Sequence, residues 1–153
     1  MKELGSISLD IELRSLTFLS ESYGHFHLEL DDLMVLGEYS TADGPWLEDL
    51  FLVFVCRDGN WWECPFGAMG VPGVLSQFEE VWHAHLTVTL GFSTQYKSRI
   101  MWPKELADNE LYQFTKGGWL DRMITQGMPA TRDLRPEVKE YVAATGNNES
   151  NRQ

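Results

Sequence analysis

The sequence predicts an α+β domain with a mostly antiparallel sheet of about five to seven strands and helices packed on one face or end. Strand-like segments fill the N-terminal two-thirds of the 153 residues, whereas helical spacing dominates the C-terminal third. Regular alternation of strands and helices, typical of parallel sheets, is missing from the pattern. Length and a hydrophobic content of 43% favour one globular domain over residues 1–146, followed by a polar tail over 147–153.

The first segments alternate between apolar and polar residues. Residues 6–14 and 23–31 each follow a period of two, which predicts half-buried strands with one solvated face. The expected inward residues are Ile7, Leu9, Ile11 and Leu13 in the first strand, and Phe26, Leu28 and Leu30 in the second. The expected solvent-facing carboxylates are Asp10, Glu12, Glu29 and Asp31. A third strand is expected over 33–39.

The middle of the chain predicts a hairpin. Residues 50–56 form a continuous apolar run, typical of a strand buried on both faces, after a turn cluster at 41–45. The Asp58-Gly59 pair then predicts a tight turn into a strand over 61–66. With that pair at the centre, Cys56 would oppose Trp61 and Val53 would oppose Cys64. Trp61 and its neighbour Trp62 would point to opposite faces.

The remaining elements follow from caps and periodicity. A glycine-rich loop over 67–73 leads to a capping box at Ser76 and Glu79, which predicts a helix near 77–85. Alternation over 86–93 predicts a strand, and 97–102 predicts another that Pro103 ends. Helices are expected over 104–115, 119–126 and 136–145, the last ended by Gly146.

The net charge of −11 is concentrated near the N-terminus. Residues 1–50 hold 11 acids and 2 bases, a balance of −9, while 51–100 hold 4 and 3 and 101–153 hold 8 and 7. No basic footprint is present for nucleic acid or an anionic membrane, so neither is expected as a partner. The acidic excess fits either a solvated surface or a face that meets a basic protein partner.

The cysteines and the chain start indicate a cytoplasmic protein. No apolar run approaches the length of a membrane span, and the first residues lack the apolar core of a signal peptide. We therefore expect Cys56 and Cys64 to stay reduced and to contribute packing. They form no Cys-x-x-Cys pair of the kind that binds zinc.

All four histidines occur in two His-x-His pairs, His25 with His27 and His83 with His85. On a strand, both imidazoles of a pair share a face and can reach one metal, with Glu29 and Asp31 nearby. A helical placement of His83 and His85 would instead separate them by about 200°. We expect no bound metal and no cofactor, and keep a metal-dependent enzyme at His25 and His27 as an alternative.

No motif identifies a reaction: the Gly-x-Ser-x-Gly elbow and the phosphate-binding loop are missing from the sequence. The leading hypothesis is a non-catalytic protein-interaction domain that uses Asp10, Glu12, Glu29 and Asp31 to bind a basic partner. In composition it is similar to small acidic neutralising proteins such as bacterial immunity proteins. A small-ligand pocket lined by Phe54, Trp82 and Trp102 is the other alternative.

Overall fold

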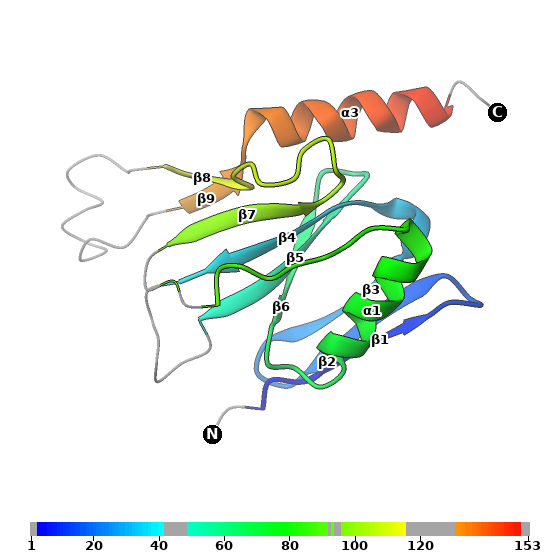
Figure 1. The fold of residues 1–153 in the computed structure, drawn as a ribbon, viewed down its shortest axis with the longest axis vertical. Helices are drawn as coiled ribbons and strands as arrows, with labels where there is room; N and C mark the ends of the chain where they lie inside the picture. The colour runs from blue at the N-terminus through cyan, green and yellow to red at the C-terminus, as the bar shows by residue number, and fades with distance from the viewer. Residues whose placement is uncertain (1–2, 42–48, 92, 94–95, 116–130, 151–153) are drawn as a thin grey trace.

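The protein is an α+β fold built mostly from antiparallel sheets, as the sequence predicted. The computed structural model describes residues 3–41, 49–91, 93, 96–115 and 131–150. The four-stranded sheet B has its strands in the order Trp61–Pro65, Leu50–Cys56, Leu33–Ser40, Lys97–Trp102. The three-stranded sheet A and helix α1 (Val71–Trp82) lie on one side of it (Figure 1). The two-stranded sheet C and helix α3 (Pro136–Ser150) lie on the other side (Figure 1). No helix in these ranges has the length and apolar character needed to cross a membrane.

Sheet A consists of β1 (Ser6–Asp10), β2 (Ser15–Ser20) and β3 (Gly24–Glu29). The strand predicted over 6–14 is wrong in its second half, because the chain turns at 11–14 and returns as β2. The Asp10 carboxylate accepts a hydrogen bond from the Leu13 amide at 2.9 Å. Arg14 completes the turn in the left-handed region, with φ of 51°. Ile11 and Leu13 consequently stay exposed, at 43% and 73%.

The alternation of the second predicted strand is confirmed. Phe26 and Leu28 are buried on the inner face of β3, and the short 3-10 helix η1 (Leu30–Asp32) buries Leu30. The polar residues between them are exposed. The alternation therefore identified the covered face, although Asp31 lies in η1 rather than in a strand.

Sheet B contains β4 (Leu33–Ser40), β5 (Leu50–Cys56), β6 (Trp61–Pro65) and β7 (Lys97–Trp102). The predicted strands at 33–39, 50–56, 61–66 and 97–102 are confirmed. β5 is covered on both faces, as its apolar run indicated, because sheet B separates two hydrophobic cores. One core joins it to sheet A and α1; the other joins it to sheet C and α3.

The predicted register of the β5–β6 hairpin is wrong by one residue. Val55 opposes Trp61 and Leu52 opposes Cys64. The Gly59 amide donates to the Cys56 carbonyl at 2.9 Å, and Gly59 has a φ of 86°. The loop therefore holds three residues with a left-handed glycine at its end, a common alternative to the two-residue turn.

Helix α1 (Val71–Trp82) begins six residues before the predicted start. Its N-cap is Gly70, in the left-handed conformation, and Pro72 occupies the first turn. The Ser76–Glu79 pair therefore lies inside the helix instead of capping it. The Glu79 carboxylate instead accepts a hydrogen bond from the Leu86 amide at 3.3 Å, just after the C-terminal end of the helix.

Two further predictions are wrong. Residues 86–91 alternate in burial but belong to no described strand, because a side-chain network replaces strand pairing there. Residues 104–115 form turns and then β8 (Tyr112–Thr115), which pairs with β9 (Thr131–Leu134). Asp108, with φ of 71°, interrupts the expected helix. The helix predicted over 119–126 and most of the turn at 41–45 lie outside the described residues.

The last helix, α3 (Pro136–Ser150), confirms the prediction at 136–145 but continues past Gly146. Val138 and Val142 lie one turn apart and are buried against sheet B, together with Leu111 and Leu134. Because α3 covers this face of sheet B, the open surface of the sheets lies on the opposite side of the molecule (Figure 1).

Candidate functional site

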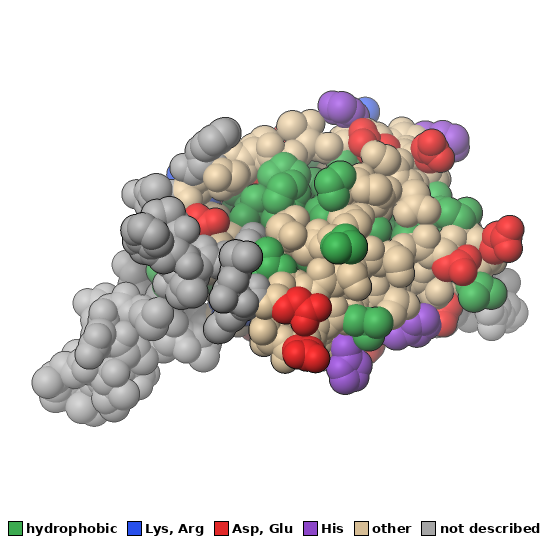
Figure 2. All heavy atoms as spheres, turned by 90° about the horizontal axis from the view of Figure 1, so that it is seen from below, with side chains coloured by type: hydrophobic (Ala, Val, Ile, Leu, Met, Phe, Trp, Pro, Cys, Tyr) green, Lys and Arg blue, Asp and Glu red, His purple; other side chains and the backbone are tan. Residues whose placement is uncertain are grey.

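The outer face of sheet A is a largely polar surface, and neither of the two helices in the described ranges packs over it (Figure 1). Its outward residues form three rows across the strands: Ser6–Leu19–His25, Ser8–Thr17–His27 and Asp10–Ser15–Glu29. Figure 2 views the molecule from this side and shows acidic and histidine side chains around scattered hydrophobic ones, with few lysines or arginines.

The four predicted partner-binding carboxylates lie near one end of this face. Asp10 and Glu29 are in the same row, two strands apart, and Glu12 is exposed in the adjoining turn. Glu12 is therefore not on the strand face expected for it, since the strand ends at Asp10. The structure brings Asp10 and Glu29 together and places Glu12 and Asp31 at the margin.

Asp31 is held by the chain itself. Its carboxylate accepts from the Arg14 guanidinium at 2.6 Å, and this hydrogen bond lowers the pKa of Asp31. The same contact raises the pKa of Arg14. Both side chains are more than half exposed, so the ion pair contributes little stability. Asp31 is thus already paired with Arg14 and is less available to a partner than Glu12 or Glu29.

A groove opens where β3 meets the β5–β6 hairpin, at the edge of sheet A. Its volume is about 540 Å³, and we call it the acidic groove. The lining residues are His27, Leu28, Glu29, Asp32, Cys56, Arg57, Asp58 and Trp62. Glu29 is the one predicted partner-binding residue among them, and His27 was considered as a metal ligand. The lining comes from two segments, 27–32 and 56–62, that are apart in sequence, so the sequence pattern did not reveal the groove.

Trp62 is the large apolar residue of the groove. It is 41% exposed, while its ring packs on Phe26 with centroids 5.7 Å apart. Trp61, on the opposite face of β6, packs on Tyr112 with ring centroids 5.9 Å apart. The expected division of the two tryptophans between faces is confirmed, and Trp62 is the exposed one.

The charges around the groove are predominantly negative. With a neutral histidine, three carboxylates and one guanidinium give a formal charge of −3 + 1 = −2. Arg57 Nε lies 3.7 Å from Asp32 Oδ1, and Arg57 Nη2 donates to the Asp31 carbonyl at 2.8 Å. Asp58 accepts from the amide of Asn60 and from its side chain, both at 2.9 Å. These contacts fix the walls of the groove.

Cys56 lies at the floor of the groove as a neutral thiol. Burial, reinforced by the negative charges of Asp58 and Asp32, raises the pKa of Cys56 to about 11. A thiol must ionise to act as a nucleophile, so this environment opposes covalent catalysis by Cys56. Cys56 and Cys64 are both buried and form no disulfide.

The histidine pairs are arranged differently from each other. His25 and His27 share the outer face of β3, and His27 Nδ1 lies 2.9 Å from Thr17 Oγ1. His83 caps α1 in a left-handed conformation, and His85 Nδ1 lies 3.1 Å from Glu79 Oε2. Among the described residues, no group of three or more His, Cys, Asp or Glu side chains is arranged to hold a metal ion.

The aromatic residues proposed to line a ligand pocket pack on one another. Trp82 stacks on Trp102 with ring centroids 3.9 Å apart, and on Phe78 at 4.4 Å. Phe54 follows at 6.4 Å from Phe78 and is fully buried. The rings therefore fill the core between sheet B and α1. A smaller hollow of about 360 Å³ reaches Trp82 and Trp102 from outside, without Phe54.

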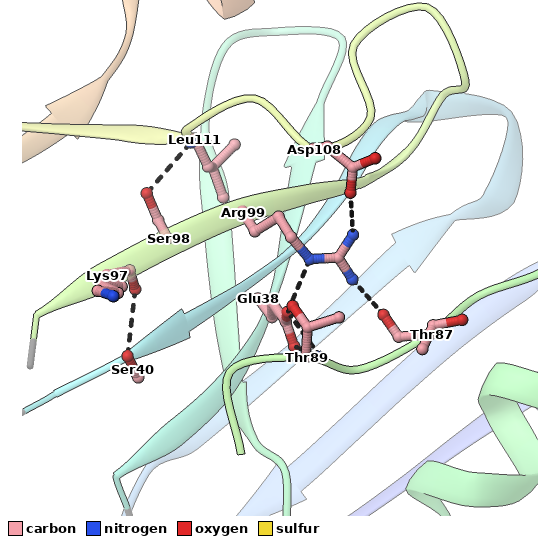
Figure 3. A network of polar contacts seen from close by, with 9 residues as sticks. All are labelled: Glu38, Ser40, Thr87, Thr89, Lys97, Ser98, Arg99, Asp108 and Leu111. Carbon is pink, nitrogen blue, oxygen red and sulfur yellow. Dashed lines mark hydrogen bonds and ion pairs between the residues drawn. The ribbon is translucent and has the colours of Figure 1, made fainter. Parts of the chain in front are cut away.

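A buried charge network explains the segment at 86–91. Glu38, 0% exposed on β4, accepts from Arg99 Nε at 2.9 Å and from the Thr89 hydroxyl at 2.8 Å (Figure 3). Arg99 also donates to the Thr87 carbonyl and to Asp108. Because hydrogen bonds satisfy Glu38 from several directions, we assign it a structural role. Sequence analysis missed it, since nothing in the pattern marks Glu38 as buried.

The comparisons with known proteins add no relative. No protein-family model matches the chain, and neither a curated protein nor a solved structure matches it. Any function therefore has to be argued from the surface of this chain.

Proposed function

We propose that the chain is a non-catalytic protein-interaction domain that binds a basic protein, as small acidic inhibitors and immunity-like proteins do. The partner would contact the outer face of sheet A and the acidic groove. The observation that carries this proposal is the groove itself, where an exposed tryptophan lies among three carboxylates.

The charge distribution supports a basic partner. The first 50 residues carry −9 of the net −11, and they include β1, β2 and β3. A concentration of one charge sign attracts an oppositely charged protein over a distance and raises the rate of encounter. An acidic face is therefore suited to fast association with a positively charged surface.

Exposed apolar side chains support a protein partner rather than solvent alone. Ile11, Leu13, Leu19 and Trp62 are each between 41% and 73% exposed. Ile11 and Leu13 lie in the turn beside the Asp10–Ser15–Glu29 row, and Leu19 lies on the outer face. Protein interfaces combine apolar anchors of this kind with a charged rim.

A cytoplasmic location is part of the proposal. Both cysteines are buried thiols, which suits a reducing compartment. In such a compartment the fold would not depend on a disulfide bond.

A charge-reversal experiment tests the proposal. Glu12 and Glu29 are exposed, and neither carboxylate holds a described turn, so Glu12→Lys/Glu29→Lys changes charge with little effect on the fold. Glu80→Lys/Glu140→Lys makes the same charge change at exposed positions on α1 and α3. Each protein is immobilised and exposed to an extract of its native source, after its thermal unfolding has been checked.

The proposal predicts that wild type and the Glu80→Lys/Glu140→Lys control retain the same basic protein. Glu12→Lys/Glu29→Lys should lose most of it, with association slowed about tenfold or more at low salt. An acidic partner, or equal loss from both variants, would contradict a specific acidic interface.

A further inference from the structure

We propose that the acidic groove holds one arginine side chain of the partner, with its guanidinium over the Trp62 ring and paired with Glu29. This inference rests on the proposed function and specifies its anchoring contact. The groove walls, the exposed indole and the charge together favour a long cationic side chain.

The shape of the groove suits a long side chain with a charged end. Leu28 and Cys56 are both buried residues that line the hollow of about 540 Å³. They supply an apolar floor at its base. The aliphatic stem of an arginine can pack on such a floor while its head reaches the polar rim. Because Cys56 is held as a neutral thiol, it adds no charge at the floor.

Trp62 is positioned before any partner arrives. Its ring lies against Phe26 with an interplanar angle of 30°, while 41% of the residue remains exposed. Tryptophan is the aromatic side chain that attracts a cation most strongly through its ring face. A ring already fixed by a core residue loses little conformational freedom when a cation stacks on it.

The three carboxylates of the groove differ in the contacts that they already make within the chain. Glu29 is 60% exposed in its side chain, and its Oε1 atom lies 3.7 Å from His27 Nε2. Asp58 is held by Asn60, and Asp32 lies beside Arg57, so these two mainly shape the potential. The formal charge of −2 attracts a cation to the groove. The two carboxylate oxygens of Glu29 are exposed enough to accept hydrogen bonds from it.

The chain contains a similar, partly exposed arrangement between Arg132 of β9 and Glu63 of β6. Arg132 pairs with Glu63 through Nη2 and Nε, and its guanidinium centre lies 5.1 Å from the Tyr39 ring centroid. Tyr112 donates from its hydroxyl to the same carboxylate at 3.1 Å. A planar guanidinium can satisfy a carboxylate and a ring together, whereas an ammonium acts as a point charge. Arginine is therefore preferred over lysine in the acidic groove.

The test is an NMR titration with three small probes. The blocked amides N-acetyl-arginine, N-acetyl-lysine and N-acetyl-citrulline methylamide are added to the full chain, and the indole N–H resonance of Trp62 is followed. Trp62→Phe identifies that resonance, and Trp61 serves as an internal reference on the opposite face of β6.

We expect the arginine probe to shift the Trp62 resonance in a saturable way. The lysine probe should bind about two- to fivefold more weakly, and the uncharged citrulline probe should have no saturable effect. Equal effects of arginine and citrulline, or an unaffected Trp62 resonance, would overturn the inference.

Matched variants locate the contact. Binding of the arginine probe is followed at the backbone amide resonance of Leu28. Glu29→Gln and Trp62→Ala should each weaken this binding about two- to fivefold. Their controls, Glu21→Gln and Leu19→Ala, are exposed positions outside the groove and should leave it unchanged. Equal losses from the variants and their controls would contradict the assignment.

The full partner separates the two proposals. If charge reversal abolishes binding of the captured basic protein but Trp62→Ala leaves its affinity unchanged, the arginine anchor is wrong and the proposed function stands. If the arginine probe binds at Trp62 while the captured partner is acidic, the groove assignment stands and the proposed function fails.

Discussion

Trp61 and Trp62 show how neighbouring residues on one strand acquire different roles. Strand alternation predicted that they face opposite sides, and this is confirmed. The sequence could not say which one is exposed, because that depends on Tyr112, about 50 positions away, covering Trp61. Glu63, the next residue, accepts from the same tyrosine, so this side of β6 is occupied by sheet C.

Cys56 illustrates how a groove residue is kept inert. Only 6% of it is exposed, and the acidic residues around it oppose ionisation. The sequence correctly placed Cys56 in an apolar strand. Asp58 lies in the hairpin turn that follows this strand, whereas Asp32 comes near Cys56 only in the folded chain.

The raised pKa of Cys56 predicts its alkylation profile. In Cys64→Ala, which leaves Cys56 as the single thiol, iodoacetamide should react slowly at neutral pH and half-maximally near pH 11. The denatured protein should react half-maximally near the ordinary value of 9.0. Since only the unfolded thiol ionises between these values, unfolding should also become easier from about pH 9 to about pH 11. A half-maximal rate near pH 9 in the native protein would contradict the assignment.

At the level of elements, strands were predicted better than their ends. Alternation identified β3, and continuous hydrophobicity identified β5, because both patterns report which faces are covered. The turn at 11–14 was missed because Ile11 and Leu13 continue an alternation that the fold does not use. Alternation at 86–91 likewise reports burial, but the partner of that segment is the Glu38 side chain rather than a strand.

The start of α1 was missed because it depends on a backbone conformation. Gly70 has a φ of 96°, and a Cβ there would clash with the Ile7 carbonyl oxygen of β1. The close approach lets β1 and the loop before α1 hydrogen-bond, with Ile7 N donating to the Met69 carbonyl at 2.8 Å.

Two glycine substitutions test this account of α1. Gly70→Ala should lower the free energy of unfolding by about 1–3 kcal/mol or more, from strain and the clash. Gly73→Ala, three residues later inside the helix, meets nothing within 4 Å and should stabilise by at most about 1 kcal/mol. Urea unfolding measures both. Equal effects would mean that Gly70 has no special conformational role.

On the scale of the whole molecule, sheet B separates two cores, and in the part of the chain that the structure describes the outer face of sheet A is left open. The acidic excess was visible in the sequence, and its location on sheet A follows from β1 and β3 lying in the first third. The groove was not predictable, because residues 27–32 and 56–62 meet through packing of sheet A against sheet B. Trp62 becomes significant only beside Glu29, which lies on another strand.

The central claim is that the acidic surface attracts a basic protein partner. The most direct measurement is the association rate of the captured partner with wild type and with Glu12→Lys/Glu29→Lys, at low salt and at about 1 M salt. Screening shortens electrostatic reach to about 3 Å at 1 M, so the large rate difference expected at low salt should almost disappear there. A rate ratio that is the same at both salt concentrations, or close to one at low salt, would contradict the claim.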